Sequence, residues 1–537
     1  MLNSITKDFI KKAISKNLKN QDSLESFKKE FCRGLRKTKN LPSQIISNTD
    51  IKRVYLKMIE RKEIKPNENL EKLLITKKIR TLSGVAVIAV LTKHYPCPGK
   101  CIYCPDESSM PKSYLSNEPA VMRAIATKFH PYAQTQARLK MLELNGHSTE
   151  KIEMIVMGGT FNYFPGRYQN WFVKECFRAL NDYPKNLIRK SRTSTLEIEK
   201  KKNEKARHRM VGLTLETRPD YINEKEIENF RKLGATRVEL GVQSIFDDIL
   251  AINKRGHLVE ATIKATKLLK EAGFKINYHL MPGMYGSTPG KDLEMFKTLF
   301  NSPDFQPDMI KIYPCVVTRN SKLFELWEKE NYQPLSNQEN KSLIKKIKKI
   351  VPPYVRITRL IRDIPEESIE AGPNISNLRQ ILQQEKVACK CIRCREVRAD
   401  YDIKEEIILD RIDYPASGGK EIFLQYTSKD KTKLFALLRL RINNEETTGN
   451  HFLPVLKNAA LIRELHTYGK STKLKTKSSD SPQHLGLGSK LVKKAEKIAK
   501  EEFGLNKMAI ISGVGVRDYY KNKLGYNLKN EYMTKAL

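Results

Sequence analysis

The chain has 537 residues, of which 40% are hydrophobic and 30% charged, and its formal net charge is +37. This length suits roughly three or four domains. So large a positive charge is unusual for an enzyme of small metabolites and favours a polyanionic partner, most commonly nucleic acid, although a Lys-rich composition without functional meaning is the simpler alternative. The chain has no run of ~20 apolar residues and no signal-peptide core at its start, so we expect a cytoplasmic protein without membrane contact.

The first 80 residues are predicted to be helical and strongly basic. They contain 21 Lys and Arg against nine Asp and Glu, an excess of 12. A dense cationic surface of this kind releases condensed counterions from nucleic-acid phosphates. We therefore expect this segment to bind RNA.

From Val85 onward, short apolar runs alternate with amphipathic helical segments, which predicts a parallel α/β sheet. Six such units, instead of the eight of a closed barrel, predict a partial (β/α)6 barrel. Polar or Gly-rich sequences come immediately after several of the strands. Parallel α/β folds place their functional sites at these C-terminal strand ends. The expected strands cover residues 85–91, 152–157, 211–215, 237–242, 275–280 and 309–313.

The pattern changes near residue 400, where we place a domain boundary. Antiparallel strands are expected at 406–409, 421–426, 434–441 and 462–468, followed by a helix over 486–502 and a strand at 508–512. This order predicts a smaller α+β domain.

Three cysteines follow the first expected strand with C-x3-C-x2-C spacing: Cys97, Cys101 and Cys104. Three thiolates this close can hold three irons of a 4Fe–4S cluster and leave the fourth iron open to the amine and carboxylate of S-adenosylmethionine. The alternatives are a zinc knuckle, for which only His94 is a nearby fourth ligand, and free thiols. The position after the first strand favours radical chemistry on S-adenosylmethionine.

Gly158, Gly159 and Thr160 follow the second expected strand. A Gly-Gly pair is most often a turn, but here its bare backbone can approach the methionyl group of S-adenosylmethionine. We expect these three residues to contact that cofactor.

A Q-x-x-G-x-G sequence, Gln483 to Gly488, precedes the helix at 486–502. Backbone N–H groups at such a helix start can hold a pyrophosphate, and the motif resembles the CoA site of the GNAT acetyltransferase superfamily. Tyr520 lies further along the chain, where its hydroxyl could act as a general acid or position a thioester. The alternative is a buried aromatic pair with Tyr519.

A second cysteine group lies at the domain boundary: Cys389, Cys391 and Cys394. Three thiolates within six residues indicate a metal, and Cys315 is a candidate fourth ligand. Zinc would then join the two domains. A second iron–sulfur cluster is the alternative.

Together, these motifs resemble the family of the Elongator catalytic subunit. The matching strings include Cys-Ile-Tyr-Cys-Pro, Val-Met-Gly-Gly-Thr-Phe, Glu-Thr-Arg-Pro-Asp, Arg-Gly-His, Arg-Glu-Leu-His and Ile-Ser-Gly-Val-Gly-Val-Arg. The resemblance runs from about residue 80 to the C-terminus. The short gap between Cys97 and Cys101 and the second cysteine group are typical of prokaryotic members, which implies action without other Elongator subunits.

This resemblance implies formation of 5-carboxymethyluridine at the wobble position of tRNA. A radical derived from S-adenosylmethionine would take hydrogen from the methyl group of acetyl-CoA, the carbon would add to C5 of the uridine, and the thioester would be hydrolysed. The electron donor is unidentified. The implied domains are a tRNA-binding segment (1–80), a radical-SAM domain (81–385), a zinc linker (386–400) and an acetyl-CoA-binding domain (401–537).

The resemblance also implies the acetyl-CoA residues: Lys151, Glu464, Leu465, His466, Thr467, Gln483, Gly486, Leu487, Gly488, Ser489 and Tyr520. Lys151 would offer a point charge to a phosphate or carbonyl. Gln243 and Lys311 each lie at or near the end of an expected strand, so we expect them to line the cofactor or substrate pocket. The rival functions are a protein lysine acetyltransferase with an iron–sulfur domain and a non-catalytic RNA-binding scaffold.

Overall fold

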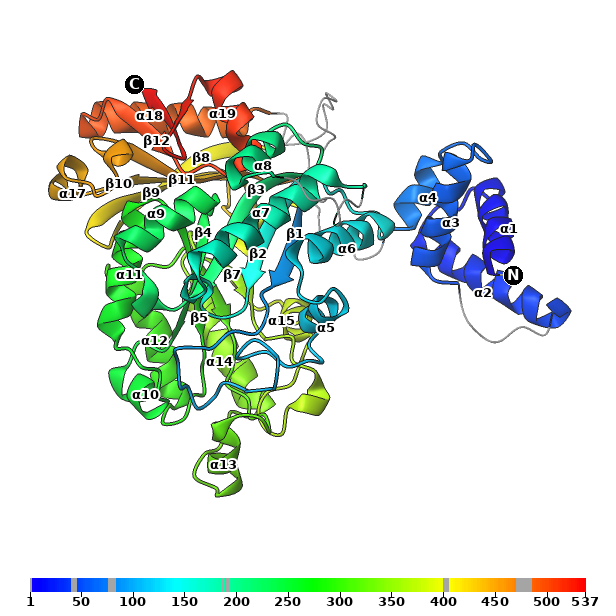
Figure 1. The fold of residues 1–537 in the computed structure, drawn as a ribbon, viewed down its shortest axis with the longest axis horizontal. Coiled ribbons are helices and arrows are strands. Elements are labelled where there is room, and N and C mark those ends of the chain that lie inside the picture. Colours follow the sequence, from blue (N-terminus) through cyan, green and yellow to red (C-terminus); the bar gives the residue numbers. More distant parts are fainter. Residues whose placement is uncertain are drawn as a thin grey trace.

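The computed structural model describes residues 2–39, 46–75, 84–185, 188, 193–398, 405–469 and 485–537. The chain begins with four helices that pack around a core of their own, which includes Phe9, Phe27, Ile51 and Tyr55. Figure 1 shows them as a separate lobe next to α6 (Pro131–Leu144). They are α1 (Leu2–Ser15), α2 (Gln21–Lys39), α3 (Asn48–Glu60) and α4 (Glu68–Leu73).

The central sheet is an open half-barrel whose seven parallel strands follow one another in chain order. The expected parallel α/β fold is confirmed. The structure has a seventh strand that the sequence did not predict. Its four residues, Arg-Ile-Thr-Arg, form a segment that is too short and too charged to stand out in the sequence. The strands are β1 (Val85–Leu91), β2 (Lys151–Met157), β3 (Arg209–Thr217), β4 (Arg237–Gln243), β5 (Lys275–Leu280), β6 (Met309–Ile312) and β7 (Arg356–Arg359).

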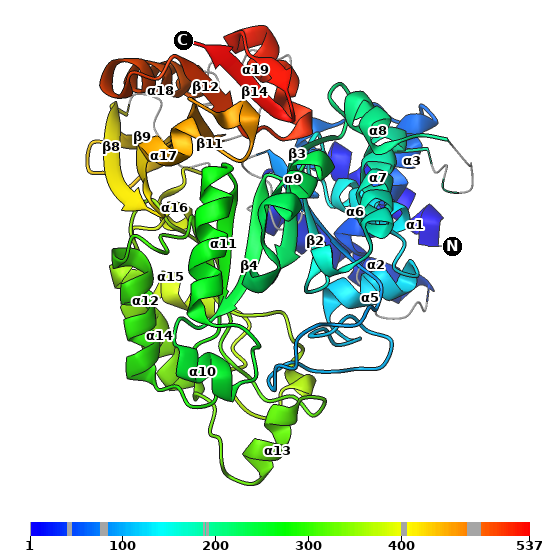
Figure 2. The same cartoon turned by 60° about the vertical axis from the view of Figure 1, so that its left-hand side comes forward.

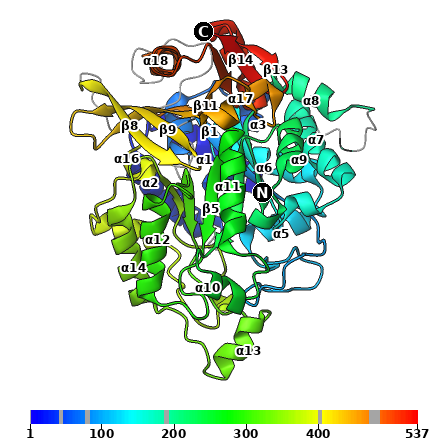
Figure 3. The ribbon, with the colours of Figure 1, turned by 90° about the vertical axis from the view of Figure 1, so that its left-hand side faces the viewer.

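Helices cover the outside of this sheet (Figures 2 and 3). The apolar periodicity of the sequence predicts one amphipathic helical segment from Met122 to Leu144. The structure has two helices there, because Pro131 starts a new helix and residues 127–130 turn the chain. The helices are α5 (Pro119–Ala126), α6, α7 (Gly166–Asp182), α8 (Leu196–Asn203), α9 (Glu224–Leu233), α10 (Asp247–Ile252), α11 (Val259–Glu271), α12 (Pro289–Asn301), α13 (Lys322–Glu328), α14 (Asn337–Ile350), α15 (Leu378–Gln384) and α16 (Ile392–Arg395).

Residues alternate between the two faces of each strand, and the alternation separates apolar from polar side chains. The helix-facing side chains join one apolar core, as Val238, Leu240 and Ile276 do. The opposite face, on the inside of the half-barrel, carries charged and polar residues such as Glu239 and Lys311. A parallel sheet covered on both faces by helices would be apolar throughout. The polar inner face therefore marks the interior of the half-barrel as a binding surface.

The C-terminal domain is a second seven-stranded sheet with the order β13-β14-β12-β11-β10-β9-β8. It is mixed and not fully antiparallel, because β11 and β12 pair in parallel over Ala460–Ile462 and Met508–Ile510. The strands are β8 (Ile407–Ala416), β9 (Gly419–Ser428), β10 (Leu434–Ile442), β11 (Ala460–Thr467), β12 (Lys507–Ile510), β13 (Asn527–Lys529) and β14 (Tyr532–Ala536), with helices α17 (Glu445–Gly449), α18 (Leu487–Phe503) and α19 (Arg517–Leu524).

The second sheet lies across the N-terminal ends of the parallel strands (Figure 2). Gly513 packs so closely on β3 that a Cβ there would lie 2.0 Å from the Val211 carbonyl oxygen. The Tyr532 hydroxyl donates to the Ala272 carbonyl at 2.8 Å. The loop after β1 lies at the opposite, C-terminal end of the half-barrel (Figure 2). Among the described helices, none has both the length and the apolar composition that a membrane crossing requires.

Candidate functional site

The three cysteines after β1 lie on an irregular loop at the C-terminal end of the half-barrel. Cys101 is buried and Cys97 is exposed, and the three sulfurs do not all lie within 4.8 Å of one another. A hydrogen bond from the Cys104 thiol, opposed by burial and helped by the Arg255 charge, lowers the pKa of Cys101 to about 4. A thiolate is the form that binds metal. The donor set of three thiols on one short loop therefore fits three irons of a 4Fe–4S cluster.

Two buried arginines support this loop. Arg255 Nη1 donates to Cys101 Sγ at 3.5 Å. Arg218 Nη2 donates to the Arg255 carbonyl at 2.9 Å, and its Nη1 packs so closely on Gly99 that a Cβ there would lie 2.3 Å away. Nη1 of Arg218 is buried without a partner in the structure. Sequence reasoning assigned no role to either arginine, although both lie in strings that carry the family resemblance.

The Gly158–Thr160 turn lies against the cysteine loop. Tyr95, Cys97, Gly158, Gly159 and Thr160 line one small hollow. Gly158 has φ +137°, and a Cβ there would lie 1.9 Å from Thr92 Oγ1, so no larger residue fits. Bare backbone next to the cysteines is available to a small ligand.

Gln243 and Lys311 both lie on the inner face of the half-barrel. Gln243 ends β4 with φ +68°, and its Oε1 is buried without a partner in the structure. The Lys311 ammonium contacts Glu239 and lies 3.9 Å from Glu216 Oε1. His279 Nε2 is 3.0 Å from Glu239 Oε2. Glu216 lies in the Glu-Thr-Arg-Pro-Asp string, but Glu239 and His279 did not stand out in the sequence, because three strands must come together to form the group.

Glu216, Glu239 and His279 are near enough to hold a cation, but the Lys311 ammonium already lies between the two carboxylates. Burial would raise the pKa of Glu239, yet the Lys311 charge, followed by His279, holds it well below its ordinary value. Burial and the Lys311 charge lower the pKa of His279. The group is therefore an ion pair with a neutral imidazole, and it does not need a metal.

The second cysteine group is assembled, with the sulfurs of Cys389, Cys391 and Cys394 within 4.8 Å of one another. The Ile392 N–H donates to the Val355 carbonyl at 3.0 Å, which places the group beside the start of β7. Hydrogen bonds from the other two thiols lower the pKa of Cys391. Three adjoining thiols are a donor set that zinc binds well.

Cys315 does not join this group, and the expectation that it supplies a fourth sulfur is wrong for this arrangement. It follows the C-terminal end of β6, whereas the second cysteine group lies beside the opposite end of β7. Its N–H donates to the Pro282 carbonyl at 2.8 Å. Burial raises the pKa of its thiol to about 12. Cys315 is thus a protonated core thiol at the same end of the half-barrel as the cysteine loop.

The expected pyrophosphate-binding turn forms the start of α18. Gly486 precedes the helix with φ +67°, and Gly488 lies against β11, where a Cβ would be 3.5 Å from Thr467 Oγ1. Ser489 Oγ lies 3.2 Å from the hydroxyl of Tyr519. Leu487 is buried, and Gln483 lies outside the described residues.

Tyr520 is only 6% exposed, and burial raises the pKa of its hydroxyl well above the ordinary value. Its ring packs against the rings of Tyr519 and Tyr526. Sequence reasoning missed Tyr519, the tyrosine whose hydroxyl reaches the start of α18. The sequence shows the Tyr-Tyr pair, but it does not show which of the two hydroxyls reaches the start of α18.

The Glu464–Thr467 segment ends β11 at the junction of the two sheets. Glu464 Oε2 accepts from Arg439 Nε at 2.8 Å, and its other oxygen lies 3.8 Å from Lys275 Nζ at the start of β5. Burial lowers the pKa of His466 to about 4, and its Nε2 has no partner in the structure. Lys151 begins β2 at the same end of the half-barrel, and burial lowers its pKa. The residues implied for acetyl-CoA thus lie opposite the cysteine loop.

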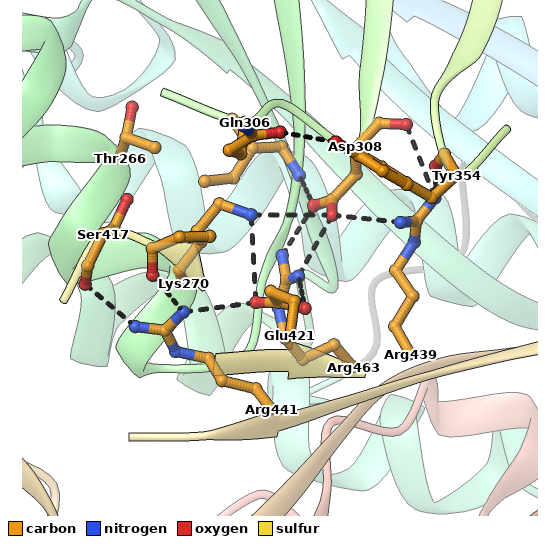
Figure 4. A network of polar contacts seen from close by, with 12 residues as sticks. Thr266, Lys270, Gln306, Asp308, Tyr354, Ser417, Glu421, Arg439, Arg441 and Arg463 are labelled. Carbon is orange, nitrogen blue, oxygen red and sulfur yellow. Dashed lines mark hydrogen bonds and ion pairs between the residues drawn. The ribbon is translucent and has the colours of Figure 1, made fainter. Parts of the chain in front are cut away.

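A buried interface network joins the two sheets here (Figure 4). Asp308, just before β6, accepts from Arg463 of β11 at 3.0 and 2.5 Å. Glu421 of β9 accepts from Arg463 at 2.8 Å, and Lys270 Nζ lies 3.8 Å from both carboxylates. Burial would raise the pKa of Asp308, but Arg463 and the other cations hold it well below its ordinary value. The network consists of Lys270, Asp308, Glu421, Arg439, Arg441 and Arg463.

Comparison with known proteins agrees with this arrangement. Residues 94–299 match the radical SAM superfamily, and residues 307–387 match the Radical_SAM C-terminal domain. The solved structure of "the archaeal Methanocaldococcus infernus Elp3 with N-terminus deletion (1-46)" is similar, with a TM-score of 0.72 and 43% identity, and the match covers 85% of this chain and 100% of that one.

Similar sequences extend over most of the chain. A protein of Methanocaldococcus infernus named tRNA uridine(34) acetyltransferase is 47% identical, over 86% of this chain and 87% of the relative. One of the same name from Dehalococcoides mccartyi is 46% identical, over 85% and 99%. Elongator complex protein 3 of Bos taurus is 37% identical, over 86% of each chain. This chain therefore contains a radical SAM domain and belongs to the Elongator complex protein 3 family.

Proposed function

We propose that this protein forms 5-carboxymethyluridine at the wobble position of tRNA, with acetyl-CoA as the carbon donor. The observation that supports this most directly is that one half-barrel carries two different candidate sites, one at each end. The cysteine loop and Gly158 lie at one end, and the start of α18 with β11 lies at the other. The relatives named tRNA uridine(34) acetyltransferase support uridine 34 of tRNA as the substrate.

The cysteine loop would hold the 4Fe–4S cluster through Cys97, Cys101 and Cys104. With a cluster and S-adenosylmethionine bound, this end would supply the radical chemistry that removes a hydrogen atom from the acetyl methyl group, so that this carbon can replace the hydrogen at C5 of the uracil ring. Arg255 stabilises the Cys101 thiolate. Gly158–Thr160 and Gln243 would receive the rest of S-adenosylmethionine.

At the other end, the start of α18 offers backbone N–H groups to the CoA pyrophosphate. Lys151, Glu464 and His466 would line the site of the thioester, and Tyr520 of α19 would support it. We assign residues 81–385 to the radical half, 386–400 to a zinc linker and 401–537 to the acetyl-CoA half. Residues 1–80 supply the cationic surface for tRNA. We expect the protein to act in the cytoplasm with an external electron donor and without other Elongator subunits.

The decisive experiment incubates the reduced enzyme with tRNA, S-adenosylmethionine and acetyl-CoA that is deuterated at the methyl group. Mass spectrometry should find carboxymethyluridine in the tRNA and deuterium in 5′-deoxyadenosine. Cys101→Ala should abolish both, whereas Cys32→Ala, at a cysteine of the N-terminal lobe, should abolish neither. Acetyl-lysine on protein without any modified uridine would establish the rival acetyltransferase function instead.

A further inference from the structure

The inner face of the half-barrel carries a group of four side chains halfway between its two ends. We name it the inner layer: Glu239 of β4, Asn277 and His279 of β5, and Lys311 of β6. Asn277 Nδ2 donates to Glu239 Oε1 at 2.9 Å, and the other Glu239 oxygen is held by His279 and Lys311. Strand register places these residues at two successive inward-facing levels, with Glu239 opposite Asn277 and His279 opposite Lys311.

One atom of the inner layer is left without a partner in the structure. Asn277 is 1% exposed, and its Oδ1 accepts no hydrogen bond from the described residues. Burying an amide oxygen in this state costs ~1–3 kcal/mol. Glu239 fixes the orientation of the amide, so Oδ1 must face away from that carboxylate. The inner layer therefore presents a fixed acceptor near an ammonium that keeps donor capacity.

We propose that the inner layer recognises the Watson–Crick edge of the target uracil, with Asn277 Oδ1 accepting from N3–H and the Lys311 ammonium donating to O4. Glu239 and His279 are positioning residues that hold these two groups in place. Uracil presents a donor next to an acceptor on this edge. Cytosine presents an acceptor at N3 and an amino donor at C4. Asn277 Oδ1 would then face another acceptor, and the Lys311 ammonium would face another donor.

The position of the inner layer supports this assignment, which rests on the proposed function. Under the proposed function, the carbon that joins C5 would come from the acetyl-CoA end, and the cysteine-loop end would supply the radical chemistry. A base held midway along the strands would lie between these two ends. The inner layer lies between Lys275, next to Glu464, and Gln243 at the cysteine-loop end of β4.

The test compares three versions of one tRNA, with uridine, 3-methyluridine or cytidine at position 34, on the reduced holoenzyme. Methylation of N3 removes the donor and sets a methyl group against Asn277 Oδ1. We expect kcat/KM for the wild-type enzyme to fall ~10-fold or more with 3-methyluridine. Asn277→Leu should modify uridine less efficiently but discriminate against 3-methyluridine less than ~3-fold. Lys311→Arg, which keeps a donor, should still reject cytidine.

Lys264→Met, on the exposed outer face of α11, is the matched control and should keep the wild-type discrimination ratio. Equal modification of uridine and 3-methyluridine by the wild-type enzyme would overturn the assignment even if Asn277→Leu did not fold. Unchanged discrimination in a folded Asn277→Leu enzyme would overturn it as well. If the wild-type enzyme modified no uridine at all, the proposed function itself would be rejected together with the inference.

Discussion

Replacing Asp308 by Asn removes one of the two carboxylates that the interface network shares among four cations. The substitution keeps the shape of the side chain, and an amide oxygen can still accept from the Ile276 N–H, which now donates to Asp308 Oδ2 at 2.9 Å. What is lost is the negative charge beside Arg463, Lys270 and Arg439, all of which are buried. Breaking a buried ion pair on one side typically costs 3–5 kcal/mol. We expect the lower value, about 3 kcal/mol of unfolding free energy.

The assay is urea unfolding at pH 7 of the wild-type protein, Asp308→Asn, Arg463→Met and the double variant. Asp304→Asn, at an exposed residue near Asp308, is the control and should change the unfolding free energy by less than ~0.5 kcal/mol. The cycle should give a coupling energy of ~1–3 kcal/mol between Asp308 and Arg463. A coupling near zero, or an Asp308→Asn protein as stable as the wild type, would refute the view that this network joins the two sheets.

The pH dependence provides a second check on Asp308. Its pKa in the folded protein is below that of the unfolded chain, so its contribution is fully present above an unfolded pKa of about 4 and is lost as pH falls toward the folded value. The stability difference between the wild-type protein and Asp308→Asn should therefore shrink as the pH falls below about 4. A difference that instead grew toward acid pH would contradict this reasoning.

Three further predictions follow from the two ends of the molecule and the N-terminal lobe. Gly158→Ala should abolish formation of 5′-deoxyadenosine, because the new Cβ would lie 1.9 Å from Thr92 Oγ1. The control Gly166→Ala should not abolish it, because no atom lies within 4 Å of the new Cβ there. Wild-type rates in Gly158→Ala would contradict the assignment of this turn to the S-adenosylmethionine site. After removal of the first cluster, metal analysis should still find about one zinc, and Cys391→Ser should lose it but Cys315→Ser should keep it. Deleting residues 1–80 should weaken tRNA binding steeply at low salt while acetyl-CoA binding persists; unchanged tRNA affinity would move the RNA site into the half-barrel.

The amino-acid sequence by itself determined the local features of this protein. The boundaries of β1 follow from a run of apolar residues and those of β5 from alternating polar and apolar residues. The helices α9 and α14 follow from helical periodicity bounded by capping residues such as Asn223 and Ser336. The two cysteine groups and the glycine turns were also visible, because each is complete within a few consecutive residues. A motif that lies within a short segment can be recognised in the sequence whatever the fold of the rest of the chain.

Only the tertiary structure decided which distant residues meet. Cys315 was a reasonable fourth ligand by residue type, but parallel strands place it at the opposite end of the half-barrel from Cys391. The inner layer draws on three strands, and the interface network draws on both sheets. The strand β7 is short and charged, and it pairs because β6 offers it a free edge. These features depend on register and strand direction, which are set by packing of the whole chain and leave no local mark in the sequence.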